Sequence, residues 1–315
     1  MFSSLAAIRS SNAAYALPQA SVAVFVGGTS GIGRSMAEAF ARYTEGNAHI
    51  VLIGRNREAA ESILASFPKP DALGNKLTHE FVQCDVTLMK NVHAVTQQLV
   101  EHYPKINFLV MSPGFLSMKG RDETAEGIDK KLAAHYYARW KFTKDLLPSI
   151  QRAKDAGEEA KVVSILGAGY GSAVDMNDLG LKKSFSPAAA GLSAPTYTDL
   201  MMEEFALKNP SVSFIHAYPG FVRTPIASKI DSAFLRFSAR AAFVLLYPFC
   251  VSPQDCAEYM WHGVFNSTGD EGSADVKGAW RIGSNGENLG RKNYFGDETQ
   301  RIRLWEHTLE SVSVD

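Results

Sequence analysis

The sequence predicts a doubly wound α/β fold, in which helices cover both faces of a parallel β-sheet. Short, continuously apolar segments alternate along the chain with longer helix-like segments, a pattern typical of parallel strands buried on both faces. A glycine-rich turn follows the first apolar segment and opens a helix, as in the first β–α unit of such sheets. The 315 residues and 46% hydrophobic content suit one large domain with a full core.

The expected strands are short and follow one another at regular intervals: 22–26, 49–53, 80–84, 107–111, 161–166 and 212–217. Helices are expected between them: from Gly33 to about Tyr43, after Arg57, at 88–101, in a long stretch that ends near Ile150, and before Lys208. Right-handed crossovers between parallel strands then give a Rossmann-type sheet of about seven strands.

Both ends of the chain extend this single domain, which we place at residues 21–315. Residues 1–20 form an N-terminal extension with a short amphipathic helix around Leu5, Ala6 and Ile8. Residues 224–252 look like an inserted helical elaboration. The C-terminal elaboration, 278–311, combines a hairpin-turn signal at Ser284-Asn285-Gly286 with a terminal helix at 296–310.

Charge excludes some classes of partner. The 32 Lys and Arg residues nearly balance the 33 Asp and Glu residues, for a net charge of -1. No field of one sign steers this chain toward nucleic acid, and no block of basic residues tracks a phosphate backbone. No apolar run reaches the roughly 18 residues of a membrane span: the nearest, 237–251, contains Ser238, Arg240 and Pro248.

The cysteine pattern points to a reducing compartment. Cys84, Cys250 and Cys256 are few, odd in number and without metal-ligand spacing. We therefore expect buried thiols, no metal site and a cytoplasmic location.

The glycine-rich turn is the most specific motif. Glycines directly after a strand allow a tight turn and let backbone N–H groups approach a pyrophosphate, whose charge the helix N-terminus stabilises. The candidate phosphate-binding residues are Gly27, Thr29, Ser30, Gly31, Ile32 and Gly33.

The second strand ends in Gly54-Arg55-Asn56, with no acidic residue. An acid at this point would accept hydrogen bonds from a ribose 2′-OH, whereas a guanidinium suits a 2′-phosphate by charge and geometry. Arg55 and Asn56, with Arg34 as a second cation, therefore predict NADP(H) rather than NAD. A solvated surface arginine is the alternative interpretation.

These motifs, in this order, resemble the short-chain dehydrogenase/reductase family from about Val22 to Thr224. The family's glycine pattern falls on Gly27, Gly31, Ile32 and Gly33. The resemblance implies further cofactor contacts at the turns that follow later strands: Asp85, Val86, Ser112, Pro113, Gly114, Pro219, Gly220, Val222 and Thr224. It also implies oxidoreductase activity. The subunits of a homodimer or tetramer would then associate through the two long helices that follow the fourth and fifth expected strands.

The family's catalytic Asn, Ser, Tyr and Lys do not appear at the matching positions. The Asn aligns with His135, and the Ser aligns with Gly167. The Tyr falls near Ser186-Pro187, which we read as a helix N-cap followed by Pro at the first helical position. The Lys falls near Ala190-Gly191. Segment 185–208 has one tyrosine, Tyr197, with no lysine four residues later, so we do not expect the usual mechanism.

Three other side chains are candidates for proton transfer. His135 occupies the Asn position and can titrate near neutral pH. Tyr170 follows the fifth strand, and Tyr218 directly precedes Pro219. For each of them, ordinary packing or a backbone hydrogen bond is the competing interpretation.

The function that we predict first is an NADPH-dependent reductase of a small apolar carbonyl, enone or imine, with a non-standard proton donor or water. Two alternatives remain open. One is a non-redox isomerase, cyclase or dehydratase, and the other is a catalytically inactive NADP-binding protein. Fold alone does not choose between them.

Overall fold

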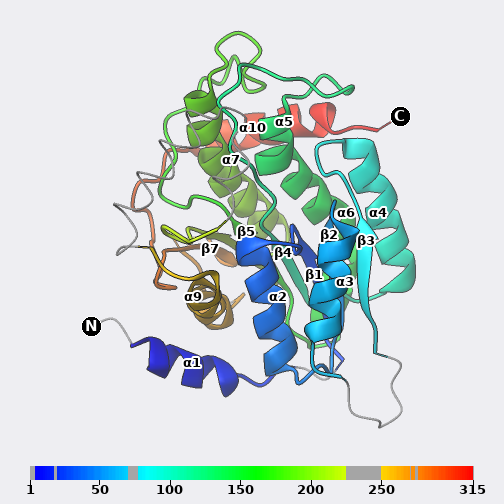
Figure 1. The fold of residues 1–315 in the computed structure, drawn as a ribbon. Helices are drawn as coiled ribbons and strands as arrows, with labels where there is room; N and C mark the ends of the chain where they lie inside the picture. The colour runs from blue at the N-terminus through cyan, green and yellow to red at the C-terminus, as the bar shows by residue number, and fades with distance from the viewer. Residues whose placement is uncertain are drawn as a thin grey trace.

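The computed structural model describes residues 4–17, 20–69, 77–224, 250–269, 271–273 and 276–314. Within them, a seven-stranded sheet of order β3-β2-β1-β4-β5-β6-β7 forms the centre of the molecule (Figure 1). All of its strand pairs are parallel. The strands are β1 (Val22–Val26), β2 (His49–Gly54), β3 (His79–Gln83), β4 (Phe108–Met111), β5 (Lys161–Ile165), β6 (Ser213–Ala217) and β7 (Ala279–Ile282).

The first strand shows why the sheet is buried on both faces. Val22, Val24 and Val26 point into one core, while Ala23 and Phe25 point into the other. Alternate side chains of a strand face opposite sides. A strand covered on both sides must therefore be apolar throughout, as the sequence predicted.

Helices cover the two faces. The face that carries Phe25 is covered by α2 (Gly31–Tyr43), α3 (Arg57–Ser66) and α9 (Pro253–Asn266). The opposite face is covered by α4 (Met89–His102), α6 (Ala138–Asp155) and α7 (Pro187–Lys208), and α10 (Glu298–Ser311) packs on α7 (Figure 1). Two short elements, α5 (Lys130–Leu132) and the π-helix η1 (Ala133–Tyr137), lead directly into α6.

Both terminal extensions pack on this domain. Helix α1 (Leu5–Ala13) lies on α9, where Ile8 is buried and Arg9 pairs with Asp255 at 2.6 Å. The predicted hairpin after residue 278 is reduced to a single antiparallel bridge, between Ile282 and Asn288. Its first strand, β7, instead joins the sheet beside β6. The predicted helical elaboration at 224–252 lies, apart from its ends, outside the described residues.

Helix α7 contains two residues of low helix propensity. Gly191 and Pro195 disfavour a helix interior, yet the helix runs unbroken from Pro187 to Lys208. Most of its residues from Ala190 onward are buried, and tertiary packing of this extent overrides low helix propensity. The start agrees with the prediction: Ser186 is the N-cap and accepts a hydrogen bond from the Ala189 N–H at 3.0 Å.

Candidate functional site

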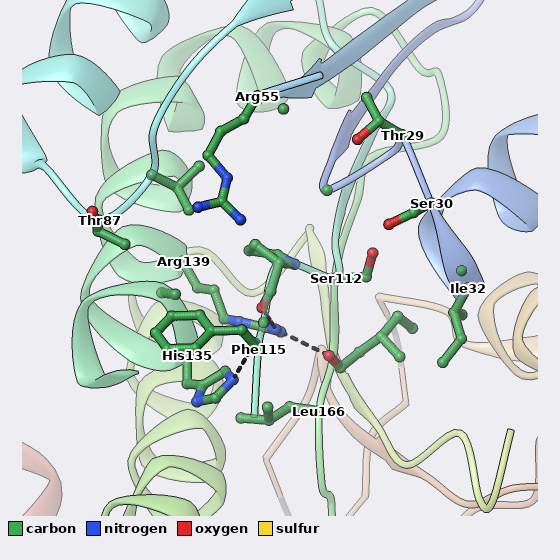
Figure 2. A pocket seen from close by; sticks show the side chains of 18 of the residues that line it. Thr29, Ser30, Ile32, Arg55, Thr87, Ser112, Phe115, His135, Arg139 and Leu166 are labelled. Atoms are coloured by element: carbon green, nitrogen blue, oxygen red, sulfur yellow. Dashed lines mark hydrogen bonds between the residues drawn. The ribbon is translucent and has the colours of Figure 1, made fainter. Parts of the chain in front are cut away.

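A cavity of about 400 Å³ opens at the carboxyl ends of the strands. The turns after β1, β2, β3, β4, β5 and β6 all contribute to it. Strand order reverses between β1 and β4, and ligands of open parallel sheets bind outside such a reversal point. The fold therefore gathers residues from six separate turns into one site (Figure 2).

The turn between β1 and α2 has no room for side chains. Gly27 and Gly31 have φ values of +81° and +56°, a region that favours glycine. A Cβ on Gly33 would lie 2.2 Å from the Ser112 Oγ. The Ser30 N-cap makes no side-chain hydrogen bond to the helix, so the first backbone N–H groups of α2 are left for an anion.

The turn after β2 carries the cation predicted for a 2′-phosphate. Arg55 lines the cavity, and its exposed side chain reaches into it (Figure 2). Asn56 also lines the cavity, but its Oδ1 accepts from the Ala59 N–H at 3.0 Å and caps α3. Arg34 is not among the described lining residues and pairs with Glu38 at 2.7 Å. Of these two arginines, only Arg55 is among the described residues that line the cavity.

The turn after β3 brings in an acid that is already engaged. The Asp85 Oδ1 accepts from the backbone N–H and the hydroxyl of Thr87, at 3.0 and 2.8 Å. Val86, Thr87 and the buried Cys84 complete this wall. The Asp85 carboxylate therefore stabilises the conformation of its own turn.

We call the part of the cavity around His135 the His135 end. Figure 2 shows Phe115, His135, Arg139 and Leu166 there, and Ile165, whose carbonyl accepts from Arg139, also lines it. The backbone N–H of Phe115 donates to the His135 Nε2 at 3.4 Å. A Cβ on Gly114 would lie 2.8 Å from that nitrogen, so Gly114 makes room for the imidazole. The His135 ring is buried in the π-helix η1, at the point where the helix widens.

Burial keeps His135 neutral. Its pKa is lowered to about 3 by loss of solvent and by the positive charges of Arg139 and Lys131. Because the Nε2 accepts a hydrogen bond, the proton of the neutral ring lies on Nδ1. Burial and these two charges therefore disfavour the imidazolium form of His135.

Most of the predicted contact residues line the cavity. They are Gly27, Thr29, Ser30, Gly31, Ile32, Arg55, Asn56, Asp85, Val86, Ser112, Pro113, Gly114, His135, Pro219 and Thr224. Gly33 is packed behind the turn. Gly220, with φ of +74°, packs on Ser284, and Val222 bridges to Val251.

The two candidate tyrosines, Tyr170 and Tyr218, pack against each other, and neither is among the described residues that line the cavity. The rings of Tyr170 and Tyr218 are 4.0 Å apart, centroid to centroid. Burial, together with a hydrogen bond to Tyr170, raises the pKa of Tyr218 well above its usual value. Tyr170 is 57% exposed. Proton transfer by either phenol therefore stays a prediction.

Sequence reasoning missed several lining residues, above all Arg139, Phe115 and Leu166. Arg139 follows His135 by four residues on one helix, and this spacing was the available signal. Phe115 and Leu166 directly follow residues that the motifs did mark, but apolar side chains after a strand are not specific to sites.

The positions of the family's Ser, Tyr and Lys have local structural roles. The Gly167 N–H donates to the His216 Nε2 at 3.1 Å, and Ser186 caps α7. Ala190 is buried. Among the described residues that line the cavity, there is no tyrosine and no lysine.

The sheet order, the glycine turn and the cavity define a Rossmann-type α/β protein. The model of the family described as "short chain dehydrogenase" matches residues 21–233, and the chain belongs to this family.

Proteins of similar sequence are named as oxidoreductases or dehydrogenases. The chain is 41% identical over 224 residues to Oxidoreductase AN1596 of Emericella nidulans, covering 71% of this chain and 65% of that protein. It is 30% identical to Oxidoreductase andH of Emericella variicolor, covering 92% and 90%. Polyprenol dehydrogenase of Homo sapiens is 26% identical, with 65% and 62% covered.

Solved structures share the fold. Actinorhodin polyketide ketoreductase, determined with NADPH, superposes with a TM-score of 0.57 at 19% identity, covering 88% of this chain and 99% of that one. An alcohol dehydrogenase from Thermococcus sibiricus, in complex with 5-hydroxy-NADP, gives 0.55 at 16% identity, covering 84% and 95%. No helix in the described ranges is long and apolar enough to cross a membrane.

Proposed function

We propose that this chain is an NADPH-dependent reductase of an apolar carbonyl, enone or imine. The observation that carries the cofactor choice is the Arg55 guanidinium, which lines the cavity directly after β2 between Gly54 and Asn56. A guanidinium there attracts a 2′-phosphate, and no carboxylate follows β2 to hold a free 2′-hydroxyl.

The cradle fits the rest of such a dinucleotide. Gly27, Gly31 and Gly33 keep the turn free of side chains, and the N-terminus of α2 presents N–H groups to a pyrophosphate. Val86, Thr87, Pro219 and Thr224 line the cavity; in the family's binding mode the first two would face the adenine end and the last two the nicotinamide end. When bound, the reduced nicotinamide supplies a hydride.

The chain's own residues bind and orient the substrate instead of donating a proton from tyrosine. Phe115, Ile165 and Leu166 give the His135 end apolar walls. Neutral His135 is fixed by the Phe115 N–H. The proton that completes reduction then comes from water, a less effective source than a positioned acid. Substrates that need little acid assistance, such as enones and imines, suit this site best.

A second candidate, dinucleotide binding without turnover, is favoured by one specific observation: the described cavity lining holds neither tyrosine nor lysine. A non-redox reaction in the same pocket shares this support.

Two measurements separate the candidates. Fluorescence titration of the purified chain with NADPH and NADH should show tighter binding of NADPH. Incubation with ketones, enones and imines should then consume the reduced-nicotinamide absorbance for at least one class. NADPH binding with no consumption across the panel contradicts the reductase and supports the binding protein, whereas product formation without a change in absorbance supports a non-redox enzyme. Failure of both dinucleotides to bind contradicts the cofactor assignment itself.

A further inference from the structure

Three basic side chains stand four residues apart along the helix that forms one wall of the cavity. They are Lys131, His135 and Arg139, carried by α5, η1 and α6 in turn. Residues at this spacing lie on the same side of a helix. His135 and Arg139 line the cavity, and Lys131 is close enough to His135 to lower its pKa.

Arg139 is a buried cation held only by neutral oxygens. Its Nη1 donates to the Ser164 Oγ at 2.6 Å and to the carbonyls of Ile165 and Met111 at 2.9 and 3.1 Å. Its Nη2 donates to the Pro113 carbonyl at 2.7 Å. The side chain is 1% exposed, and its Nε is buried with no hydrogen-bond partner.

No carboxylate in the described part of the chain forms an ion pair with Arg139. The acids nearest in the sequence are engaged elsewhere: Asp129 caps the start of the helix and Asp145 pairs with Lys141. Burial lowers the pKa of Arg139 to about 9, so it remains charged at neutral pH. A buried charge without a counter-charge is costly, and an anion in the cavity would offset that cost.

Lys131 adds to the same field. Its Nζ donates to the Pro187 carbonyl at 2.6 Å and lies 3.7 Å from the point where a side chain on Gly191 would begin. Burial lowers its pKa, and the Asp129 carboxylate partly opposes this shift. That carboxylate already accepts the N–H groups of Asp122, Lys131 and Leu132. The lysine is thus held beside the wall on which His135 and Arg139 stand.

The rest of the His135 end is neutral or apolar. Asp85 is the one carboxylate among the described lining residues, and it accepts from Thr87 in the turn after β3. Phe115, Ile165 and Leu166 supply apolar surface around the basic wall (Figure 2). A positive field within apolar walls favours an anion whose charge is delocalised over a flat apolar group, because such an anion loses less hydration energy than a compact one.

We propose that the His135 end is a binding site for an acidic enol or phenol, taken up as its oxyanion, with Arg139 as the fixed cation. Binding of the oxyanion does not depend on the cofactor. The substrate class rests on the proposed reductase, which implies an apolar compound that carries an acidic oxygen beside the carbonyl, enone or imine that accepts the hydride.

The test uses 4-nitrophenol, which ionises near neutral pH and absorbs visible light only as its anion, with 4-nitroanisole as the neutral comparator. The full chain is titrated without dinucleotide across neutral pH. We expect the bound phenol to ionise at lower pH than the free phenol, by about one pH unit or more. The anion should bind about tenfold more tightly than the ether. Equal binding of phenol and ether, or no shift in ionisation, overturns the proposal.

Arg139→Met should remove the preference for the anion, and Arg139→Lys should retain part of it. Arg152→Met, on the same helix but exposed, is the matched control and should leave the preference unchanged. Circular dichroism checks that each variant is folded. If Arg139→Met does not fold, Lys131→Met tests the same field and should weaken the preference by a smaller factor. An unchanged preference in the variant that folds, or in both variants if both fold, overturns the role of the wall. NADPH binding to the natural chain is measured in a separate titration. If the chain binds the phenolate but not NADPH, the result contradicts the proposed reductase and leaves the oxyanion site standing.

Discussion

Arg139 donates a 2.6 Å hydrogen bond to the Oγ of Ser164, and this contact ties helix α6 to the middle of the sheet. Ser164 is fully buried within β5, between strands β4 and β6. The serine is thus committed to holding a guanidinium in place. Its hydroxyl satisfies a buried cation and is not placed to orient a substrate.

Ser164→Ala should lower the free energy of unfolding by about 1–3 kcal/mol, because it removes an acceptor from a buried charge. Ser149→Ala is the matched control: the Ser149 Oγ accepts from Arg152 at 2.9 Å, but Arg152 is exposed and water can replace the serine. Urea unfolding of the two variants measures the difference. Equal losses of unfolding free energy in the two variants would show that the buried contact to Arg139 stabilises the fold no more than the exposed contact to Arg152.

Arg55→Ala should raise the Kd for NADPH by about tenfold or more, because it removes a charge-assisted contact to the 2′-phosphate. The Kd for NADH should hardly change, since NADH lacks that phosphate. Arg34→Ala is the control, because Arg34 is occupied by Glu38 outside the described cavity lining. Fluorescence titration gives both constants. A parallel loss of affinity for both dinucleotides would remove Arg55 from the specificity assignment.

Local rules predicted the sheet and the cradle well. Continuous apolar strands, the Ser186-Pro187 helix start and the glycine turn all follow from backbone and burial constraints that a few neighbouring residues express. The reverse holds for the His135 end. Whether Arg139 finds a carboxylate, or only neutral oxygens from β4, β5 and the turn after β4, depends on which distant segments surround it. The sequence contains the four-residue spacing but not those partners.

Tyr170 and Tyr218 illustrate the same limit. Both follow strands at the carboxyl edge of the sheet, as the site hypothesis requires. Their rings instead contact each other, with centroids 4.0 Å apart, and neither residue is among the described lining residues. Gly169, with φ of +79°, directly precedes Tyr170 and sets the direction of the chain after β5. A turn of this kind changes where the next side chain points without changing the strand pattern.

Gly33→Ala should abolish dinucleotide binding and destabilise the fold. Its Cβ would lie 2.2 Å from the Ser112 Oγ and 2.6 Å from the Gly27 carbonyl oxygen, so the backbone of the cradle must move, at a cost of about 1–3 kcal/mol. Gly120→Ala is the control, since no heavy atom lies within 4 Å of the added Cβ. Thermal unfolding with and without NADPH measures both effects. If Gly33→Ala kept full NADPH stabilisation, close packing behind the turn would not be needed for binding.

The burial of His135 predicts a stability that falls on acidification. In the folded chain its pKa is lowered to about 3, whereas an unfolded histidine titrates near 6.5. Between these values the unfolded state binds more protons, so the stability from neutral His135 is complete above about pH 6.5 and is lost as the pH falls. Between about pH 7 and pH 5, this one residue should lower the free energy of unfolding by about 2 kcal/mol.

His135→Gln removes that dependence, because its side chain does not titrate while its oxygen can still accept from the Phe115 N–H. Urea unfolding at the two pH values should show a smaller loss for this variant than for the natural chain. His102→Gln, at an exposed position, should leave the loss unchanged. Other buried histidines, such as His216, whose pKa burial also lowers, contribute equally to all three proteins and cancel in the difference. An identical pH dependence in His135→Gln and the natural chain would mean that the imidazole can be protonated within the fold, and His135 would then again be a candidate acid.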